Sequence, residues 1–147
     1  TQAASHRLEG YRRGLEKNKL PVLKEYIFKT DYSRGQARQA AEAMLALSDR
    51  PTAVFVASDS MALEVMSVAN ERGLKITRDL SVVGFDDNPS GLYGPVALTT
   101  VRQPLVKMAQ DSVKELNVIM NLGKKAPVKK TYLPTELVIR ESCQPVK

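Results

Sequence analysis

The chain has 147 residues, 43% of them hydrophobic and 26% charged, a composition that favours one folded globular domain over a disordered segment. Its apolar stretches are shorter than the ~20 residues of a transmembrane helix, no basic-then-apolar secretory start is present, and the single cysteine excludes an internal disulfide. The net charge of +6 is spread along predicted helices and loops, so we do not predict a nucleic-acid-binding patch.

The amino end predicts a helix before any strand. Apolar spacing places this helix at about Ser5 to Lys17, and no methionine precedes it. In α/β proteins such a helix normally follows a central strand, so we expect that strand to lie upstream of Thr1 and the chain to be the carboxy-terminal piece of a longer protein. In this piece the sheet is then gapped, rearranged or completed by a second copy. An edge strand is predicted from Val22 to Phe28, because charged residues interrupt its apolar ones.

Further along, helices and strands alternate. Two strands are continuous apolar runs, which is typical of strands covered on both faces, and each stops at acidic residues. Asp59 is placed to cap the helix that follows it. The elements predicted in this part are a helix capped by Ser33, strands at 52–57 and 80–85, a helix at 60–72, a short strand at 98–101, a long helix from Pro104 to Gly123 and a last strand at 132–139. The predicted class is therefore α/β, with three layers and a mainly parallel sheet flanked by helices.

Polar side chains cluster at the predicted strand ends, where open α/β sheets bind their ligands. Carboxylates accept from hydroxyls, amides and arginines donate, and an aromatic ring covers an apolar face, so the set predicts a polyol or similar ligand. Each member also has a structural alternative: Arg7 as a solvated helix residue, Asp59 as a helix cap. For Asp86 the functional and structural interpretations stay open. The candidates are Arg7, Asp31, Tyr32, Ser58, Asp59, Asp86 and Gln103.

Catalytic and metal-binding motifs are not found. The sequence has no Gly-rich phosphate loop, no GxSxG turn and no paired-histidine motif, and His6 is its only histidine. Asp86 and Asp87 are adjacent, so on an extended chain they point in opposite directions and do not face one substrate as acid and base. A receiver domain is disfavoured because its acidic pair follows the first strand, whereas this pair follows a late one. We therefore expect no enzyme, no metal and no cofactor.

Five segments together resemble one family of bacterial regulators. They are RLEGYRRGL at 7–15, PTAVFVASDSMAL at 51–63, ERGLKITRDLSVVGFDD at 71–87, LTTVRQP at 98–104 and LPTELVIRESC at 133–143. In these segments the chain resembles the carboxy-terminal half of the effector-binding core of transcription regulators of the lactose-repressor and galactose-repressor class. Periplasmic solute-binding proteins of transport systems share the fold and form the alternative, but the last two segments are more like the regulators.

The resemblance implies a periplasmic-binding-protein-like core of two subdomains, with a sugar or other polar metabolite between them. Residues 1–100 would form most of the carboxy-terminal subdomain, 101–134 would cross to the amino-terminal subdomain and carry the long helix there, and 135–147 would be the return strand and tail. The long helix should then expose apolar surface. A DNA-binding domain, absent from this chain, would read the operator.

By motif, the resemblance assigns ligand contacts to Arg7, Tyr32, Ser58, Asp59, Asp86 and Gln103. The lactose repressor carries asparagine at the position of Ser58, so its sugar contact there is not expected. The class is homodimeric, cytoplasmic and not membrane-bound, and some members respond to a phosphorylated partner protein instead of a sugar. Leu63 and Met66 are candidates for the dimer contact, with burial on their own sheet as the alternative.

Overall fold

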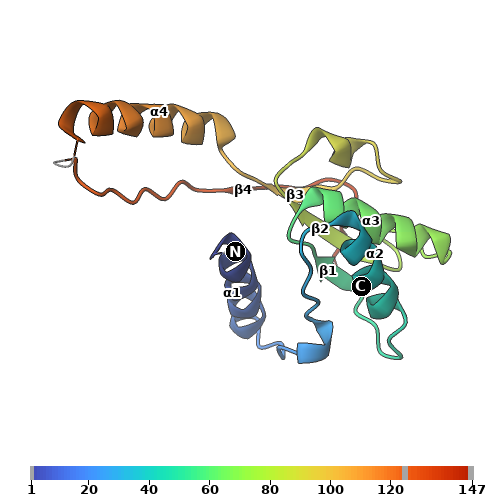
Figure 1. Ribbon diagram of the computed structural model, residues 1–147. Coiled ribbons are helices and arrows are strands. Elements are labelled where there is room, and N and C mark those ends of the chain that lie inside the picture. Colours follow the sequence, from blue (N-terminus) through green and yellow to red (C-terminus); the bar gives the residue numbers. More distant parts are fainter. Residues whose placement is uncertain (1, 124–125, 146–147) are drawn as a thin grey trace.

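The computed structural model describes residues 2–123 and 126–145 (Figure 1). The last two residues of the predicted return strand and tail, 146 and 147, lie outside the described residues. The helices are α1 (Gln2–Lys17), α2 (Arg34–Leu45), α3 (Asp59–Glu71) and α4 (Leu105–Leu122), with short 3-10 turns at Lys24–Tyr26 and Pro89–Leu92. The strands are β1 (Ala53–Phe55), β2 (Ser81–Phe85), β3 (Thr99–Arg102) and β4 (Glu136–Val138).

The sheet has the order β1-β2-β3-β4. β1 pairs parallel with β2, and β2 pairs parallel with β3, with Val54 opposite Val82 and Gly84 opposite Thr100. β4 lies antiparallel to β3, with Leu137 opposite Val101. The predicted α/β class with a mainly parallel sheet is confirmed. Because the first three strands run the same way, the segments that follow them emerge at one edge of the sheet.

Serine side chains cap the amino ends of two helices. Ser33 caps α2, as predicted, by accepting a hydrogen bond from the backbone N–H of Gln36. Ser58 caps α3 in the same way through the N–H of Met61. The prediction that Asp59 caps this helix is therefore wrong by one residue: Asp59 is its first helical residue, and its side chain is directed elsewhere.

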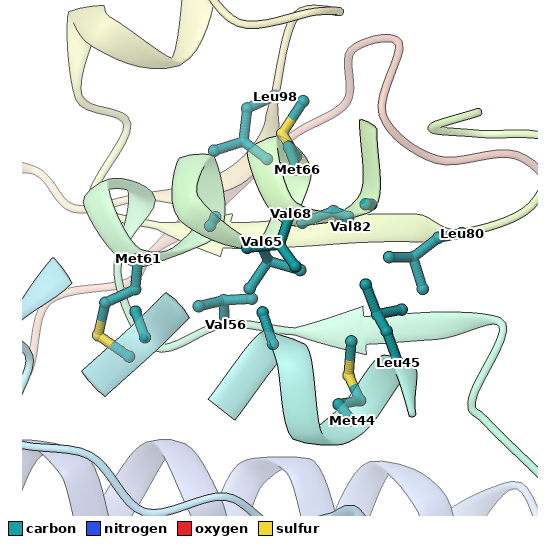
Figure 2. Close-up of a cluster of buried hydrophobic side chains, with 14 residues drawn as sticks. Met44, Leu45, Val56, Met61, Val65, Met66, Val68, Leu80, Val82 and Leu98 are labelled. Carbon is teal, nitrogen blue, oxygen red and sulfur yellow. The ribbon is translucent and has the colours of Figure 1, made fainter. Parts of the chain in front are cut away.

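The core lies between the sheet and the pair α2 and α3. Figure 2 shows Val65 and Val68 from α3 beside Val56 and Val82, and Met44 and Leu45 from α2 nearer β1. All of them are buried. Along β2, Val82 and Gly84 are buried toward α3, whereas the alternate residues are only half-buried. The helices α2 and α3 thus cover one face of the sheet. On the other side α1 has no buried residue and lies apart from the sheet (Figure 1).

The edge strand predicted at Val22–Phe28 does not form. The segment holds a 3-10 turn at Lys24–Tyr26, flanked by extended residues at Leu23 and Ile27. A strand is stable only when a neighbour accepts its ladder of hydrogen bonds. An apolar cavity, bounded by Ile27 and Phe28 on one side and by β1 on the other, separates this segment from the sheet.

α4 stands away from the rest of the chain, joined to it by the segments beside β3 and β4 (Figure 1). None of its residues is buried. Its exposed large apolar side chains include Leu105, Val106, Met108, Val113, Leu116, Ile119 and Met120. The prediction that this helix exposes apolar surface is confirmed. Within the described residues, no helix combines the length and apolarity needed to cross a membrane.

Candidate functional site

Three of the predicted ligand-contacting residues meet at the carboxyl ends of the parallel strands. Asp86 directly follows β2, Gln103 follows β3, and Arg7 reaches the same place from α1. The Gln103 side-chain amide donates to Asp86 Oδ1 over 2.7 Å, and an Arg7 guanidinium nitrogen lies 3.6 Å from the same oxygen. The Asp86 side chain is 38% exposed and that of Arg7 16%, so the cluster is open to solvent on the Asp86 side.

Arg7 is held by contacts other than the ion pair. Its guanidinium carbon lies 3.8 Å from the centre of the Phe85 ring, and it donates a hydrogen bond to the Ala57 carbonyl oxygen. Phe85 in turn contacts Phe55 edge to face, with ring centres 6.5 Å apart. These contacts orient the guanidinium, so Arg7 is not the solvated helix residue of the structural alternative.

The two aspartates after β2 point to different partners because the backbone turns sharply there. Asp86 has φ +112° and Asp87 φ +53°, a left-handed region that non-glycine residues rarely occupy. The Asp86 N–H still donates to Val101 O over 2.9 Å, which ties the turn to β3. Strained conformations of this kind persist where neighbouring contacts fix them, and they gather at binding sites.

Asp87 joins the two segments that leave the sheet toward α4 and return from it. One oxygen accepts from Arg102 Nε over 2.6 Å, at the end of β3, and the other accepts from Arg140, just after β4. Arg140 also donates to Leu98 O over 2.8 Å. Burial raises the pKa of Asp87, but the hydrogen bonds from both arginines outweigh it and hold the pKa below its ordinary value.

Asp59 and Ser58 lie beneath this cluster instead of in it. Asp59 is 1% exposed, and its oxygens accept from the Thr100 hydroxyl and the Asn88 N–H, each over 2.6 Å. Burial raises the pKa of Asp59, these two hydrogen bonds oppose the rise, and nearby Asp86 adds to it. Ser58 is also buried, and its hydroxyl is engaged as the α3 cap. In this conformation both residues support the turn that presents Asp86.

Tyr32 and Asp31 lie outside the cluster. Tyr32 packs against the hydrophobic core with φ +69° and lines a cavity of about 450 Å³ along β1. Arg7 lines the same cavity, but Asp86 and Gln103 do not. Asp31 accepts from the Ser33 N–H over 2.8 Å and shapes the turn before α2.

Two residues that local sequence patterns do not single out prove important to the site. Phe85 forms the platform for Arg7, and its signal was an aromatic residue at the last position of a strand. Arg140 fixes Asp87 from 53 residues away, and no local pattern pointed to that contact.

The two candidates for a dimer contact lie differently. Met66 is fully buried in the core, which matches the alternative of burial on its own sheet. Leu63 is half-buried and packs against that core.

The geometry suits binding of a polar molecule. A carboxylate, an amide and a guanidinium converge beside an aromatic ring, an arrangement that can accept from and donate to hydroxyl groups. Asp86 Oδ2 has no hydrogen-bond partner among the described residues. In the same part of the chain, no group of three or more His, Cys, Asp or Glu residues is arranged to hold a metal ion.

Comparisons with known proteins give one consistent result. Residues 1–143 match the family described as periplasmic binding protein-like domain. The chain is 38% identical, over 138 residues, to the HTH-type transcriptional regulator MalR of Clostridium butyricum, covering 93% of this chain and 40% of that protein.

Two solved structures share the fold and more than a quarter of the aligned residues. The complex of the transcriptional regulator CelR with cellobiose has a TM-score of 0.86 at 29% identity, covering 92% of this chain and 41% of that one. The lac repressor dimer bound to operator and an anti-inducer has a TM-score of 0.83 at 32% identity, covering 96% and 48%. The chain thus spans less than half of each of these proteins.

Proposed function

The chain belongs to the periplasmic binding protein-like domain family, in the form found in regulators of the lactose-repressor class, and on this basis we propose that it senses a small polar effector for a transcription regulator. Membership confirms the resemblance predicted from the five sequence segments. The effector contacts proposed from this half of the cleft are Arg7, Asp86 and Gln103. The other wall would come from polypeptide outside this chain.

The observation that carries the proposal is the convergence of Arg7 and Gln103 on one carboxylate oxygen of Asp86, at the ends of parallel strands. Asp86 would accept from effector hydroxyls, while Arg7 and Gln103 donate to ring or hydroxyl oxygens. A sugar is the effector class we favour, because the similar regulator CelR is described in complex with cellobiose. A phosphorylated partner protein is the other signal that the family resemblance allows.

The larger organisation of the protein is also part of the proposal. Residues 1–100 would form most of one subdomain, 101–134 would carry α4 into the other, and 135–147 would return. Operator DNA would be bound by a domain outside this chain, in a cytoplasmic homodimer like the lac repressor dimer. Leu63 is the dimer-contact candidate that keeps exposed surface.

The same contacts supply a mechanism. Gln103 and Arg102 lie at the end of β3, where the chain leaves for α4, and they bind Asp86 and Asp87 respectively. An effector that competes for Asp86 changes how this crossing segment is held. The effector then shifts the operator-binding equilibrium by its difference in affinity for the two arrangements.

The test uses the intact protein encoded by the parent gene. A fixed panel of mono- and disaccharides, including cellobiose and maltose, is screened for release or tightening of operator binding. With the active sugar, Asp86→Ala should weaken the response by about 10- to 100-fold, because it removes a charged acceptor, without changing operator affinity. Asp79→Asn, which alters a carboxylate of an ion pair outside the cluster, is the matched control.

Each result decides a different part of the proposal. An unchanged response in Asp86→Ala would remove the site assignment. A panel without an active sugar would remove the sugar class in favour of a partner protein. An intact protein that binds a sugar but no DNA would be a transport receptor.

A further inference from the structure

The two adjacent aspartates after β2 face different groups: Asp86 lies in the effector cluster, and Asp87 lies between arginines beside β3 and β4. We propose that Asp87 is a positioning residue, which transmits a change at Asp86 to the two segments that connect the sheet with α4. The proposal rests on the proposed function, because it assigns a means of regulation to the same site. It does not require that the effector be a sugar.

The segment that leaves for α4 is held through Arg102, the last residue of β3. Its Nε donates to Asp87 Oδ2 over 2.6 Å, and a terminal guanidinium nitrogen donates to Glu136 Oε2 over 3.4 Å. Arg102 also lies opposite Glu136 in the antiparallel ladder of β3 and β4. One guanidinium therefore links Asp87 to the place where the chain leaves the sheet for α4 and to the place where it returns (Figure 1).

The returning segment is held through Arg140, just beyond β4. Arg140 donates to the other oxygen of Asp87 and to the Leu98 carbonyl oxygen, and its backbone N–H donates to Thr99 Oγ1 over 2.9 Å. The side chains of Asp87 and Arg140 are 14% and 17% exposed. Water screens an ion pair at this depth only in part, so the orientation of Asp87 matters more to Arg140 than it would at the surface.

The shape of the turn makes the two aspartates move together. Their φ angles, +112° and +53°, are rare for non-glycine residues, and such conformations persist only where neighbouring contacts fix them. The Asp86 N–H donates to Val101 O over 2.9 Å, and the Asp87 N–H donates to Thr100 Oγ1 over 3.4 Å. Because one planar peptide joins the two residues and both are bonded to β3, a change in the orientation of Asp86 also reorients Asp87.

Asp87 is not itself placed to contact an effector, because both of its carboxylate oxygens accept from arginines. A molecule that binds Asp86 and displaces the Gln103 amide would instead act on these arginines through the turn. The arginines would then hold the segments to α4 differently. The turn thus supplies two arrangements that an effector can distinguish by its affinity.

The test needs no effector. Gln103→Ala, in the intact protein encoded by the parent gene, removes the side-chain donor to Asp86, and backbone hydrogen exchange is followed by mass spectrometry. We expect the amides of residues 139–142, which include the Arg140 N–H, to exchange about threefold faster or more. Gln36→Ala is the matched control, because the Gln36 side chain accepts from the Asp31 N–H outside the cluster, and it should leave 139–142 unchanged.

Asp87→Asn separates transmission from a local structural role. If the change passes through Asp87, adding Gln103→Ala to Asp87→Asn should give no further acceleration at 139–142, whereas two independent structural effects would multiply. Arg140→Lys keeps the charge but loses the simultaneous contacts with Asp87 and Leu98 O. It should suppress the effect of Gln103→Ala in the same way, and it decides the question if Asp87→Asn does not fold.

Two results would overturn the proposal. One is unchanged exchange at 139–142 in Gln103→Ala, and the other is multiplying effects in the double variants. Neither result depends on the sugar panel or on operator binding, so a failure of this coupling and a failure of the proposed function are told apart.

Discussion

Gly84 is the position where a single methyl group should do most damage to the site. It lies in β2 directly above the buried carboxylate of Asp59. A Cβ added there would stand 2.2 Å from Asp59 Oδ1 and 2.9 Å from Leu98 Cδ2. Both neighbours are buried, so neither can swing into solvent. Gly84→Ala therefore forces the carboxylate to move.

The cost follows from what the carboxylate would lose. A displacement of about 1 Å, enough to restore ordinary van der Waals contact, would take Asp59 beyond hydrogen-bonding distance of Thr100 and Asn88, both now at 2.6 Å. Overpacking costs about 1–3 kcal/mol and an unsatisfied buried acceptor about as much again. We expect a loss of about 3 kcal/mol in the free energy of unfolding and a fall in Tm of about 6–12 °C.

The assay is urea and thermal unfolding of the 147-residue chain. Gly35→Ala is the matched control, because its methyl group in α2 meets no atom within 4 Å beyond the adjacent residues and the helix's own backbone, and it should be neutral or stabilising. In the double variant Gly84→Ala with Asp59→Ala, removing the carboxylate relieves the clash. The double variant should therefore lose less stability than the sum of the single variants.

If Gly84→Ala unfolds at the same urea concentration as Gly35→Ala, the close packing of β2 on Asp59 does not exist and the account of the turn fails. Strict additivity in the double variant would show that Gly84 acts through Leu98 instead of Asp59.

Two further predictions concern ionic contacts. Hydrogen bonds from Arg78 and from the Lys75 N–H lower the pKa of Asp79 from 3.8 to about 2. The contribution of Asp79 to folding stability is therefore complete above pH 3.8 and is lost as pH falls toward 2. In urea unfolding, the stability difference between wild type and Asp79→Asn should be smaller at pH 3 than at pH 6, and a difference that grows on acidification would contradict this sign. Arg140→Lys keeps the charge but loses the simultaneous contacts with Asp87 and Leu98 O, and should lower the free energy of unfolding by about 1–2 kcal/mol. As a control, Arg78→Lys in its exposed ion pair should change stability little. Equal effects of the two substitutions would show that the Arg140 contacts do not hold the segment after β4.

Part of the site could be predicted because it depends on which residues directly follow the strands along the chain. Asp86 comes directly after a continuous apolar run, and Gln103 follows the next strand, so the shared edge of a parallel sheet brings them together. Asp59 met the same criterion but turned inward, because the Thr100 hydroxyl and the Asn88 N–H, both distant in sequence, accommodate its carboxylate. A strand-end aspartate on its own does not reveal which of these two directions its side chain takes.

The sequence alone determined the elements whose evidence is local. Period and capping residues defined α2 and α4, and the apolar runs defined β1 and β2, since propensity and side-chain spacing act within a few residues. Only the tertiary structure determined that Val22–Phe28 forms no strand, that Asp59 is buried and that Arg140 donates to Asp87. Each of these depends on a partner far along the chain, or on one absent from the described sheet. Strand pairing and the burial of a charge are set by such partners and not by the segment itself.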